Sequence, residues 1–371
     1  MSSLERKAAK MLAVGFTGTT PSDELRALIR RGVCSAILFK RNIETPEQIA
    51  TLTAGIKQIA STPFLLCVDQ EGGRVARLRE GFTAIPSMRA LGKTNDPQFA
   101  HDVGRVLARE LRAVNIDLDF TPVVDVDTNP NNPVIADRSF GPDVDLVSRM
   151  GTALIKGLQD NGVAACAKHF PGHGDTSQDS HYDLPRLPHS MDRLQRVELP
   201  PFQAAVDAGV AMIMTSHVIF EPLDGKYPAT MSRPALDGIL RDQMHYDGVV
   251  ISDDLEMKAI ADHFELEDVI IRGVNAGCDL FALCHSAELQ NQFIDILVHA
   301  VERGDVKRDR IDEANRRVDR LLHDFAEPPE KGDGSHFRHI LNSPEHRAII
   351  ARNGAAEERT ADPTDMAAHR R

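Results

Sequence analysis

The segment that decides the fold reads Val163-Ala164-Ala165-Cys166-Ala167-Lys168-His169-Phe170-Pro171-Gly172-His173-Gly174-Asp175-Thr176-Ser177-Gln178-Asp179-Ser180-His181. Five small or apolar residues lead directly into a run of histidines, aspartates, glycines and a lysine. A buried strand that ends in a titratable, glycine-rich loop is how a parallel α/β protein builds an active site. Packing alone does not require so many ionisable groups, because burying them unpaired costs free energy. The segment therefore predicts a strand of a parallel sheet with chemistry at its carboxyl end.

Similar apolar runs recur along the chain at intervals that fit an intervening helix. Most are continuously apolar, which is typical of strands covered on both faces. The segments between them carry helix signals, such as the capping-box sequence Thr45-Pro46-Glu47-Gln48 and the start at Asp96-Pro97. Strands alternating with amphipathic helices predict an α/β fold of the (β/α)8 TIM-like barrel class, and periodicity leaves a doubly wound open sheet as the alternative. The eight runs are residues 11–16, 34–39, 64–68, 116–121, 163–167, 210–215, 249–252 and 278–283.

Polar residues follow several of these runs. In a barrel the carboxyl ends of the strands converge on one rim, where catalytic groups gather, so this recurrence supports the barrel independently of the helix signals. The residues in question are Asp69 after the third run, Lys168-His169 after the fifth, Ser216-His217 after the sixth and Asp253-Asp254 after the seventh.

Bulk properties narrow the class of protein. The net charge of −12 and the pI near 5.7 argue against nucleic acid and against an anionic membrane surface, and they point to no particular partner. The five cysteines lack C-x-x-C spacing, so they are predicted to be buried free thiols in a reducing compartment. We expect neither a signal peptide nor a membrane span, and therefore a cytoplasmic location. The sequence does not indicate an oligomeric state.

The chain is predicted to hold one catalytic domain with a C-terminal extension. Residues 1–327 carry the strand–helix pattern of the barrel. The pattern stops near residue 328, and residues 328–371 are predicted to form a linker, a short helix over residues 336–350 docked on the barrel, and a disordered tail from residue 355.

The long loop after the fifth run is the first candidate for chemistry. Asp179 stands two residues before His181, where its carboxylate can orient the imidazole and raise its basicity. His181 would then give and take a proton near neutral pH. The alternative is that His181 is a solvated loop residue.

Strand-end carboxylates and arginines form the second group of candidates. Asp253 or Asp254 is suited to act as nucleophile, general base or metal ligand, and the alternative is a cap for the next helix. Asp69 with Arg77 would clamp a polar ligand, or else form a buried pair that holds the loop. Arg138 would reach a ligand, or else lie on the surface.

A metal site is a further alternative for the same loop. Its histidines and aspartates are ligand types for zinc or another divalent ion, but the spacing H-x3-H-x7-H matches no zinc signature and the sequence H-E-x-x-H is absent. We expect no metal and no cofactor. The residues that the metal alternative would use are His169, His173, Asp175, Asp179 and His181.

Taken together, four segments resemble the family 3 glycoside hydrolases, and among them the single-domain bacterial β-N-acetylhexosaminidases. The K-H-F-P-G-H-G stretch with its downstream D-S-H carries most of the resemblance, which covers roughly residues 10–325. The matching segments are residues 69–77 (D-Q-E-G-G-R-V-x-R), 137–140 (D-R-S-F), 168–181 and 252–255 (S-D-D-L).

The resemblance implies a role for each matching residue. Asp253 is implied to be the catalytic nucleophile and His181 the general acid/base, with Asp179 orienting it; Asp254 is given no catalytic step. A retaining glycosidase normally uses two carboxylic acids, so a histidine in the second role departs from the usual pair. The residues implied to hold the hydroxyls of the terminal sugar are Asp69, Arg77, Arg138, Lys168 and His169.

The activity that the resemblance implies is a retaining exo-β-N-acetylglucosaminidase acting on a carbohydrate substrate. The implied substrates are muropeptides, GlcNAc-anhydroMurNAc peptides from peptidoglycan recycling. The alternatives are a metal-dependent barrel hydrolase that uses the His/Asp loop, a β-glucosidase of the same family, and a sugar-binding protein without catalysis. The sequence leaves open the aglycone, the tolerance for N-acetylgalactosamine and whether water or phosphate is the acceptor.

Overall fold

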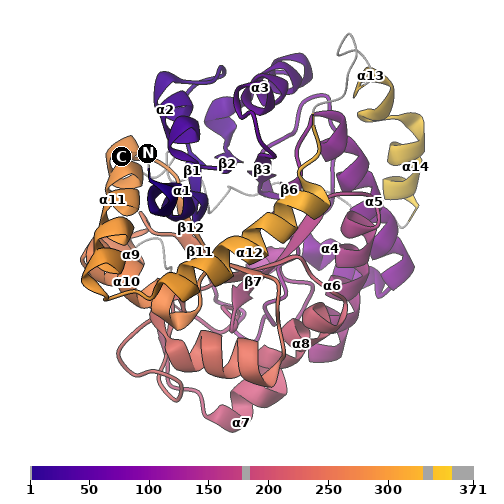
Figure 1. The fold of residues 1–371 in the computed structure, drawn as a ribbon. Helices are drawn as coiled ribbons and strands as arrows, with labels where there is room; N and C mark the ends of the chain where they lie inside the picture. The colour runs from indigo at the N-terminus through magenta and orange to yellow at the C-terminus, as the bar shows by residue number, and fades with distance from the viewer. Residues whose placement is uncertain (1, 178–183, 329–336, 353–371) are drawn as a thin grey trace.

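The structure is a computed structural model of the 371-residue chain, and it describes residues 2–177, 184–328 and 337–352. Eight parallel strands close into a barrel in the order β1-β12-β11-β9-β7-β6-β3-β2 (Figure 1). Each predicted apolar run overlaps one of them, so the (β/α)8 prediction is confirmed and the open sheet is wrong. The barrel strands are β1 (Leu12–Gly15), β2 (Ser35–Leu38), β3 (Leu65–Val68), β6 (Leu118–Asp119), β7 (Ala164–Phe170), β9 (Met212–Thr215), β11 (Val249–Asp254) and β12 (Leu280–Leu283).

Two small strand pairs lie outside the barrel. β4 (Gln70–Gly72) and β5 (Val75–Ala76) form an antiparallel hairpin just after β3, and β8 (Arg186–Leu187) pairs in parallel with β10 (Ile219–Phe220). Neither pair was predicted. Both follow barrel strands at their carboxyl ends, so they belong to the loops that shape that rim.

Helices surround the barrel (Figure 1). The α-helices are α1 (Ser3–Lys10), α2 (Asp23–Arg31), α3 (Pro46–Ile59), α4 (Met88–Thr94), α5 (Pro97–Ala113), α6 (Val144–Gln159), α7 (Met191–Arg193), α8 (Leu199–Asp207), α9 (Lys258–Ala261), α10 (Leu266–Ala276), α11 (Ala287–Arg303), α12 (Arg308–Phe325), α13 (Phe337–Ile340) and α14 (Pro344–Ala351). The 3₁₀ turns are η1 (Lys40–Asn42), η2 (Ala136–Arg138) and η4 (Ala229–Met231), and the π-helical segments are η3 (Leu194–Glu198) and η5 (Pro234–Gln243).

The predicted helix starts are confirmed, with one difference in detail. Asp96 accepts the N–H of Phe99 at the start of α5, and Thr45 Oγ1 accepts the N–H of Gln48 at 3.1 Å at the start of α3. In a capping box the Gln48 side chain would accept the backbone N–H of Thr45, but here it accepts a different N–H. Gln48 Oε1 accepts the N–H of Glu44, at 2.9 Å, one residue before the cap.

The core has two parts, as a barrel requires. The larger part lies between the strands and the surrounding helices, and the smaller one fills the barrel interior. Helix α12 adds Val318, Leu321 and Leu322 to the interior cluster and crosses one end of the barrel (Figure 1). That end is therefore closed by packing, which leaves the other rim for a site. All five cysteines are buried and unbridged, so the predicted free thiols are confirmed.

The C-terminal extension differs from its prediction. In place of one helix, the structure has α13 and α14, because Asn342 adopts a left-handed conformation with φ 47° and Pro344 begins the next helix. Both helices pack on α5, where buried His346 lies 2.8 Å from Glu110. The predicted linker lies mostly outside the described residues, and the predicted tail does so entirely.

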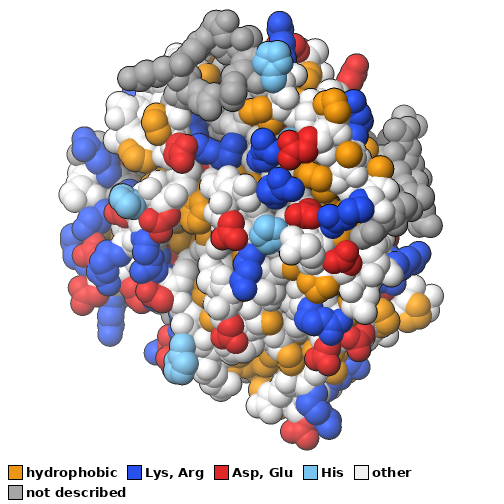
Figure 2. All heavy atoms as spheres, turned by 90° about the vertical axis from the view of Figure 1, so that its right-hand side faces the viewer, with side chains coloured by type: hydrophobic (Ala, Val, Ile, Leu, Met, Phe, Trp, Pro, Cys, Tyr) orange, Lys and Arg blue, Asp and Glu red, His pale blue; other side chains and the backbone are white. Residues whose placement is uncertain are grey.

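The outer face near this extension carries charges of both signs. Acidic and basic side chains are interspersed on the face shown in Figure 2, and some of them pair across α5 and α14, as Arg109 does with Glu345 at 3.1 Å. None of the helices among the described residues is long and apolar enough to cross a membrane.

Candidate active site

The predicted polar strand ends meet at one rim of the barrel. Asp69 directly follows β3, Lys168 lies within β7, and Asp253 is the next-to-last residue of β11. Burial raises the pKa of the Cys166 thiol in the barrel interior, and the charges of Asp69 and Asp253 both add to that shift while Lys168 opposes it. Both carboxylates lie at carboxyl ends of parallel strands in one closed barrel, so they lie at the same rim.

A network of buried charges occupies this rim. Lys168 Nζ donates to Asp69 Oδ1 and lies equally close to Glu71 Oε1, 2.7 Å in both cases. Arg138 binds Glu71 through two parallel bonds, from Nε at 2.9 Å and from Nη2 at 2.8 Å. Arg77 Nη2 lies 3.5 Å from Asp69 Oδ2. Such buried charges are stable only when they are paired, so the network fixes each side chain in one position.

The charges in this network are held in their ionised forms. Burial alone would raise the pKa of Glu71, but Arg138 and Lys168 hold it well below its usual value. Burial alone would lower the pKa of Lys168, but Asp69 and Glu71 hold it above its usual value. The rim therefore offers fixed charges as hydrogen-bonding partners at neutral pH.

The β4–β5 hairpin places Glu71 and Arg77 in the network. Its turn depends on Gly72, at φ 99°, where an added Cβ would lie 2.4 Å from the carbonyl oxygen of Pro86. The Gln70 side chain closes the hairpin by accepting the backbone N–H of Arg77 at 2.9 Å. The tight turn predicted at Gly72-Gly73 is confirmed.

A buried aspartate orients the histidine of the network. Asp125 accepts from His169 Nδ1 at 2.8 Å and from the backbone N–H of His173 at 2.7 Å. Burial would raise the pKa of Asp125, but these contacts lower it overall. An ionised Asp125 assigns the Nδ1 proton to His169, which turns Nε2 toward Arg138 at 3.4 Å.

Asp253 lies on an irregularity in its strand. From Ile251 to Asp254, three steps along β11 face two steps along β12, so β11 carries one extra residue. A β-bulge of this kind interrupts the ladder and redirects a side chain. The N–H of Asp254 donates to Asp253 Oδ1 at 2.8 Å, and the Asp253 side chain is partly exposed. The bulge thus presents Asp253 at the open rim.

The neighbouring Asp254 is in a different state. Burial, followed by the charges of Glu256 and Asp253, raises the pKa of Asp254 to about 8. Its Oδ1 accepts from the N–H of Glu256 at 3.1 Å and of Cys284 at 3.3 Å. A carboxyl that stays protonated at neutral pH adds no second negative charge beside Asp253.

The predicted acid/base pair, Asp179 and His181, lies outside the described residues. The described residues on either side of that gap are joined to each other, since Asp175 Oδ2 lies 2.8 Å from His189 Nε2 and Oδ1 lies 3.3 Å from Arg193. Both ends of the loop are therefore anchored at the rim.

The described members of the predicted sugar-binding set are brought together, but two members of the network were given no role by sequence reasoning. Glu71 lies within the D-Q-E-G-G-R segment, whose pattern indicates no role for it, and the sequence pattern indicates none for Asp125. The surface alternative for Arg138 is wrong, because Arg138 is only 4% exposed. A usable signal for Asp125 was its place directly after the apolar pair Val123-Val124, beyond the predicted fourth strand.

A metal site was the alternative for this rim. Within residues 2–177, 184–328 and 337–352, no group of three or more His, Cys, Asp or Glu side chains is arranged to hold a metal ion. Two of the five candidate ligands, Asp179 and His181, lie outside those ranges.

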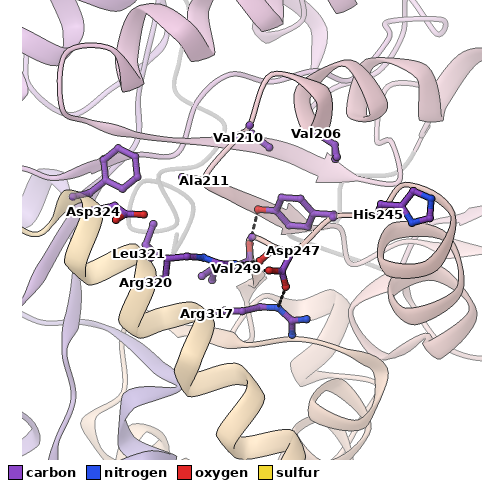
Figure 3. Close-up of a pocket in the computed structure, with 14 residues that line it drawn as sticks. Val206, Val210, Ala211, His245, Asp247, Val249, Arg317, Arg320, Leu321 and Asp324 are labelled. Atoms are coloured by element: carbon purple, nitrogen blue, oxygen red, sulfur yellow. Dashed lines mark hydrogen bonds and ion pairs between the residues drawn. The ribbon is translucent and has the colours of Figure 1, made fainter.

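A cavity of about 430 Å³ lies at the other end of the barrel (Figure 3). Its walls include Val210, Asp247 and Val249, at or just before the beginnings of β9 and β11, together with Arg317 and Leu321 of α12. Asp247 accepts from Arg317 Nε at 3.1 Å, as Figure 3 shows. Because parallel strands begin at the rim opposite to where they end, this cavity is separate from the predicted site and holds none of its residues.

Comparison with known proteins agrees with this geometry. The family model described as the glycosyl hydrolase family 3 N terminal domain matches residues 3–321. A β-hexosaminidase from Thiobacillus denitrificans is 41% identical over 278 residues, which is 73% of this chain and 77% of that protein. A β-hexosaminidase from Bordetella parapertussis is 39% identical over 326 residues, which is 85% of this chain and 88% of that protein.

Solved structures are similar over nearly the whole chain. A family 3 β-N-acetylglucosaminidase from Paenibacillus sp. has a TM-score of 0.88 at 38% identity, covering 95% of this chain and 68% of that one. NagZ from Neisseria gonorrhoeae, solved in complex with N-trifluoroacetyl-D-glucosamine, has a TM-score of 0.79 at 33% identity, covering 93% and 98%. The chain therefore belongs to glycosyl hydrolase family 3 and is a glycoside hydrolase.

Proposed function

We propose that this chain is a retaining exo-β-N-acetylglucosaminidase that removes terminal, non-reducing, β-linked N-acetylglucosamine. The chain is a β-N-acetylhexosaminidase, like the relatives named above. The observation that carries the finer proposal is the fixed network of Asp69, Glu71, Lys168 and Arg138 on the rim that also presents Asp253. A rigid polar floor beside a partly exposed carboxylate is what a sugar ring and its anomeric carbon require.

The residues of the network are suited to different hydrogen-bonding roles toward the sugar. Asp69 is suited to accept from sugar hydroxyls, because its side chain remains 17% exposed. Lys168, Arg77 and Arg138 are suited to donate to hydroxyl oxygens, and His169 is held in orientation by Asp125, which accepts from its Nδ1. We assign these five residues, Asp69, Arg77, Arg138, Lys168 and His169, to the terminal sugar.

The reaction that we assign has two steps. In the first, the Asp253 carboxylate attacks the anomeric carbon while His181 donates a proton to the leaving oxygen, which yields a glycosyl–Asp253 ester. In the second, His181 takes a proton from water, the water attacks the anomeric carbon, and the ester bond breaks to release the sugar and Asp253. Asp179 orients His181 through both steps. Two displacements at one carbon retain its configuration.

The proposed physiological substrates are muropeptides of the GlcNAc-anhydroMurNAc type from peptidoglycan recycling, met in the cytoplasm. The five buried, unbridged cysteines support a reducing compartment. The complex of the Neisseria gonorrhoeae protein with an N-acylglucosamine supports the sugar.

The test compares p-nitrophenyl N-acetylglucosaminide with p-nitrophenyl glucoside, and follows the anomer released first by NMR. We expect kcat/KM to favour the N-acetylglucosaminide by about 100-fold or more, because unpaired polar partners penalise the wrong substrate, and we expect the β-anomer first. Preference for glucoside would favour the β-glucosidase alternative. Activity lost on exhaustive chelation and restored by zinc would favour the metal-dependent hydrolase.

A further inference from the structure

The strand between the two bulged strands of the site carries a dipeptide that the proposed reaction does not use. Strand β9 lies between β7 and β11 in the barrel and is followed by Ser216-His217. β7 also has an extra residue, since three steps from Ala167 to Phe170 face two steps on β9. Both neighbours of β9 are therefore irregular near the rim where the site residues lie, β7 against β9 and β11 against β12.

Ser216 and His217 each bind the backbone of a neighbouring strand, one on each side of β9. The N–H and the hydroxyl of Ser216 both donate to the carbonyl oxygen of Phe170 in β7, at 2.8 and 3.0 Å. On the other side, the β9–β11 ladder reaches only as far as Met214 and Ile251. Beyond it, His217 Nε2 lies 3.1 Å from the carbonyl oxygen of Asp254.

The tautomer of His217 follows from these contacts. A carbonyl oxygen only accepts, so Nε2 of His217 carries the proton that it donates to Asp254. Nδ1 lies 2.9 Å from Thr230 Oγ1, which in turn lies 2.8 Å from Thr215 Oγ1. The side chains of His217, Thr215 and Thr230 are fully buried. Contacts at both ring nitrogens therefore hold the imidazole in one orientation.

This bond reaches the reacting carboxylate through one residue. Asp254 receives the His217 proton on its carbonyl oxygen, and its own N–H donates to Asp253 Oδ1 at 2.8 Å. We propose that His217 is a positioning residue, which fixes the bulged backbone of β11 and thereby aims the Asp253 carboxylate at the anomeric carbon. The inference rests on the proposed role of Asp253 as nucleophile.

A purely structural histidine would behave differently from a positioning one. Removing it leaves a buried carbonyl unpaired, which destabilises the fold in either case. If His217 also aims Asp253, kcat falls while the affinity for N-acetylglucosamine stays, because the sugar-binding network lies on β7 and on the segments that follow β3 and β6. A displacement of about 1 Å in a reacting group lowers the rate by roughly 100-fold.

The experiment measures kcat and KM for p-nitrophenyl N-acetylglucosaminide, Kd for N-acetylglucosamine and thermal stability in His217→Ala and His217→Gln. We expect kcat to fall by about 10- to 100-fold in His217→Ala, with Kd within about threefold of wild type. The Gln amide is able to donate to the same carbonyl, so His217→Gln should recover most of the lost rate. His346→Ala and His346→Gln are the matched controls, because His346 is equally buried but lies in α14.

The outcomes separate the two proposals. An unchanged kcat in folded His217→Ala, or a kcat loss matched by an equal loss in N-acetylglucosamine affinity, overturns the positioning role. Full activity in Asp253→Ala overturns the proposed function itself. If His217→Ala does not fold, Thr230→Val decides, because it removes the hydroxyl that holds the imidazole. A lower kcat at unchanged Kd then supports the inference, and an unchanged kcat overturns it.

Discussion

Both ends of the barrel bury carboxylates against lysine and arginine side chains. The two ends differ in how fully the oxygens of those carboxylates are occupied by hydrogen-bond donors of the protein. At the closed end, Asp117 is fully buried and accepts from Lys57 at 2.6 Å, from Arg112 at 2.8 Å and from the backbone N–H of Leu66 at 2.9 Å. At the open end, Asp69 accepts from Lys168 but keeps part of its side chain exposed.

The closed end repeats its arrangement at a second strand. Asp279 precedes β12 and accepts from Arg241 and Arg310, both at 2.6 Å, and from the N–H of Val250 at 3.0 Å. In both cases a carboxylate at the start of one strand binds the backbone of the neighbouring strand. Buried charge alone therefore does not mark an active site. The open rim is distinguished by carboxylates that still have an accessible oxygen for a ligand.

The largest expected difference between the ends is in activity. Asp253→Ala should lower kcat by about 10⁴-fold or more, the size of effect that removing a covalent nucleophile has. Asp279→Asn, at the closed end, should destabilise the fold and leave kcat within about twofold when assayed well below its melting temperature. Equal activity losses in the two variants, measured with p-nitrophenyl N-acetylglucosaminide, would break the distinction.

The next effect is on stability. Glu71→Gln should lower the free energy of unfolding at pH 7 by about 3–5 kcal/mol, because it leaves Arg138 and Lys168 buried with one counter-charge fewer. The folded-state pKa of Glu71 lies below its unfolded value, so its contribution is present above about pH 4.3 and is lost toward acid pH. Denaturant unfolding at several pH values measures this.

Asp117→Asn is the matched variant for Glu71→Gln at the closed end. Both changes should destabilise the protein, but only Glu71→Gln should raise KM, since only Glu71 holds the residues that face the sugar. A raised KM in Asp117→Asn would mean that the two ends are not separate in function.

A smaller effect concerns Asp254. Its folded pKa of about 8 lies above the unfolded value of about 3.9, so the folded state binds the extra proton and wild-type stability falls as pH rises between these values. Asp254→Asn has no carboxyl at this position and therefore lacks this pH-dependent contribution to stability. Its free energy of unfolding should therefore rise relative to wild type by roughly 1 kcal/mol per pH unit between pH 5 and 7. A pH-independent difference between the two would place the Asp254 proton elsewhere.

The barrel and its rim could be predicted because their signals are local. Apolar runs marked all eight strands, and the first polar residue after a run marked Asp69, Lys168 and Asp253. The contact between Asp69 and Arg77 could also be predicted from the sequence, because a short hairpin joins the two residues.

The rest depends on contacts between distant parts of the chain. Glu71 is recognisable as the centre of the network only once Arg138, 67 positions away, lies beside it. Asp125 needs His169, 44 positions away. The break between α13 and α14 has a local signal in Asn342-Ser343-Pro344, which the single-helix prediction passed over.

The most direct test of the account is to trap the reaction on the enzyme. The protein is incubated with a 2-fluoro glycoside that has a good leaving group, digested, and examined by mass spectrometry. The account predicts one fluoro-sugar attached to the peptide that contains Asp253, at Asp253 itself. A sugar attached to another residue such as Asp254, or hydrolysis through an inverted product without any covalent adduct, would contradict it.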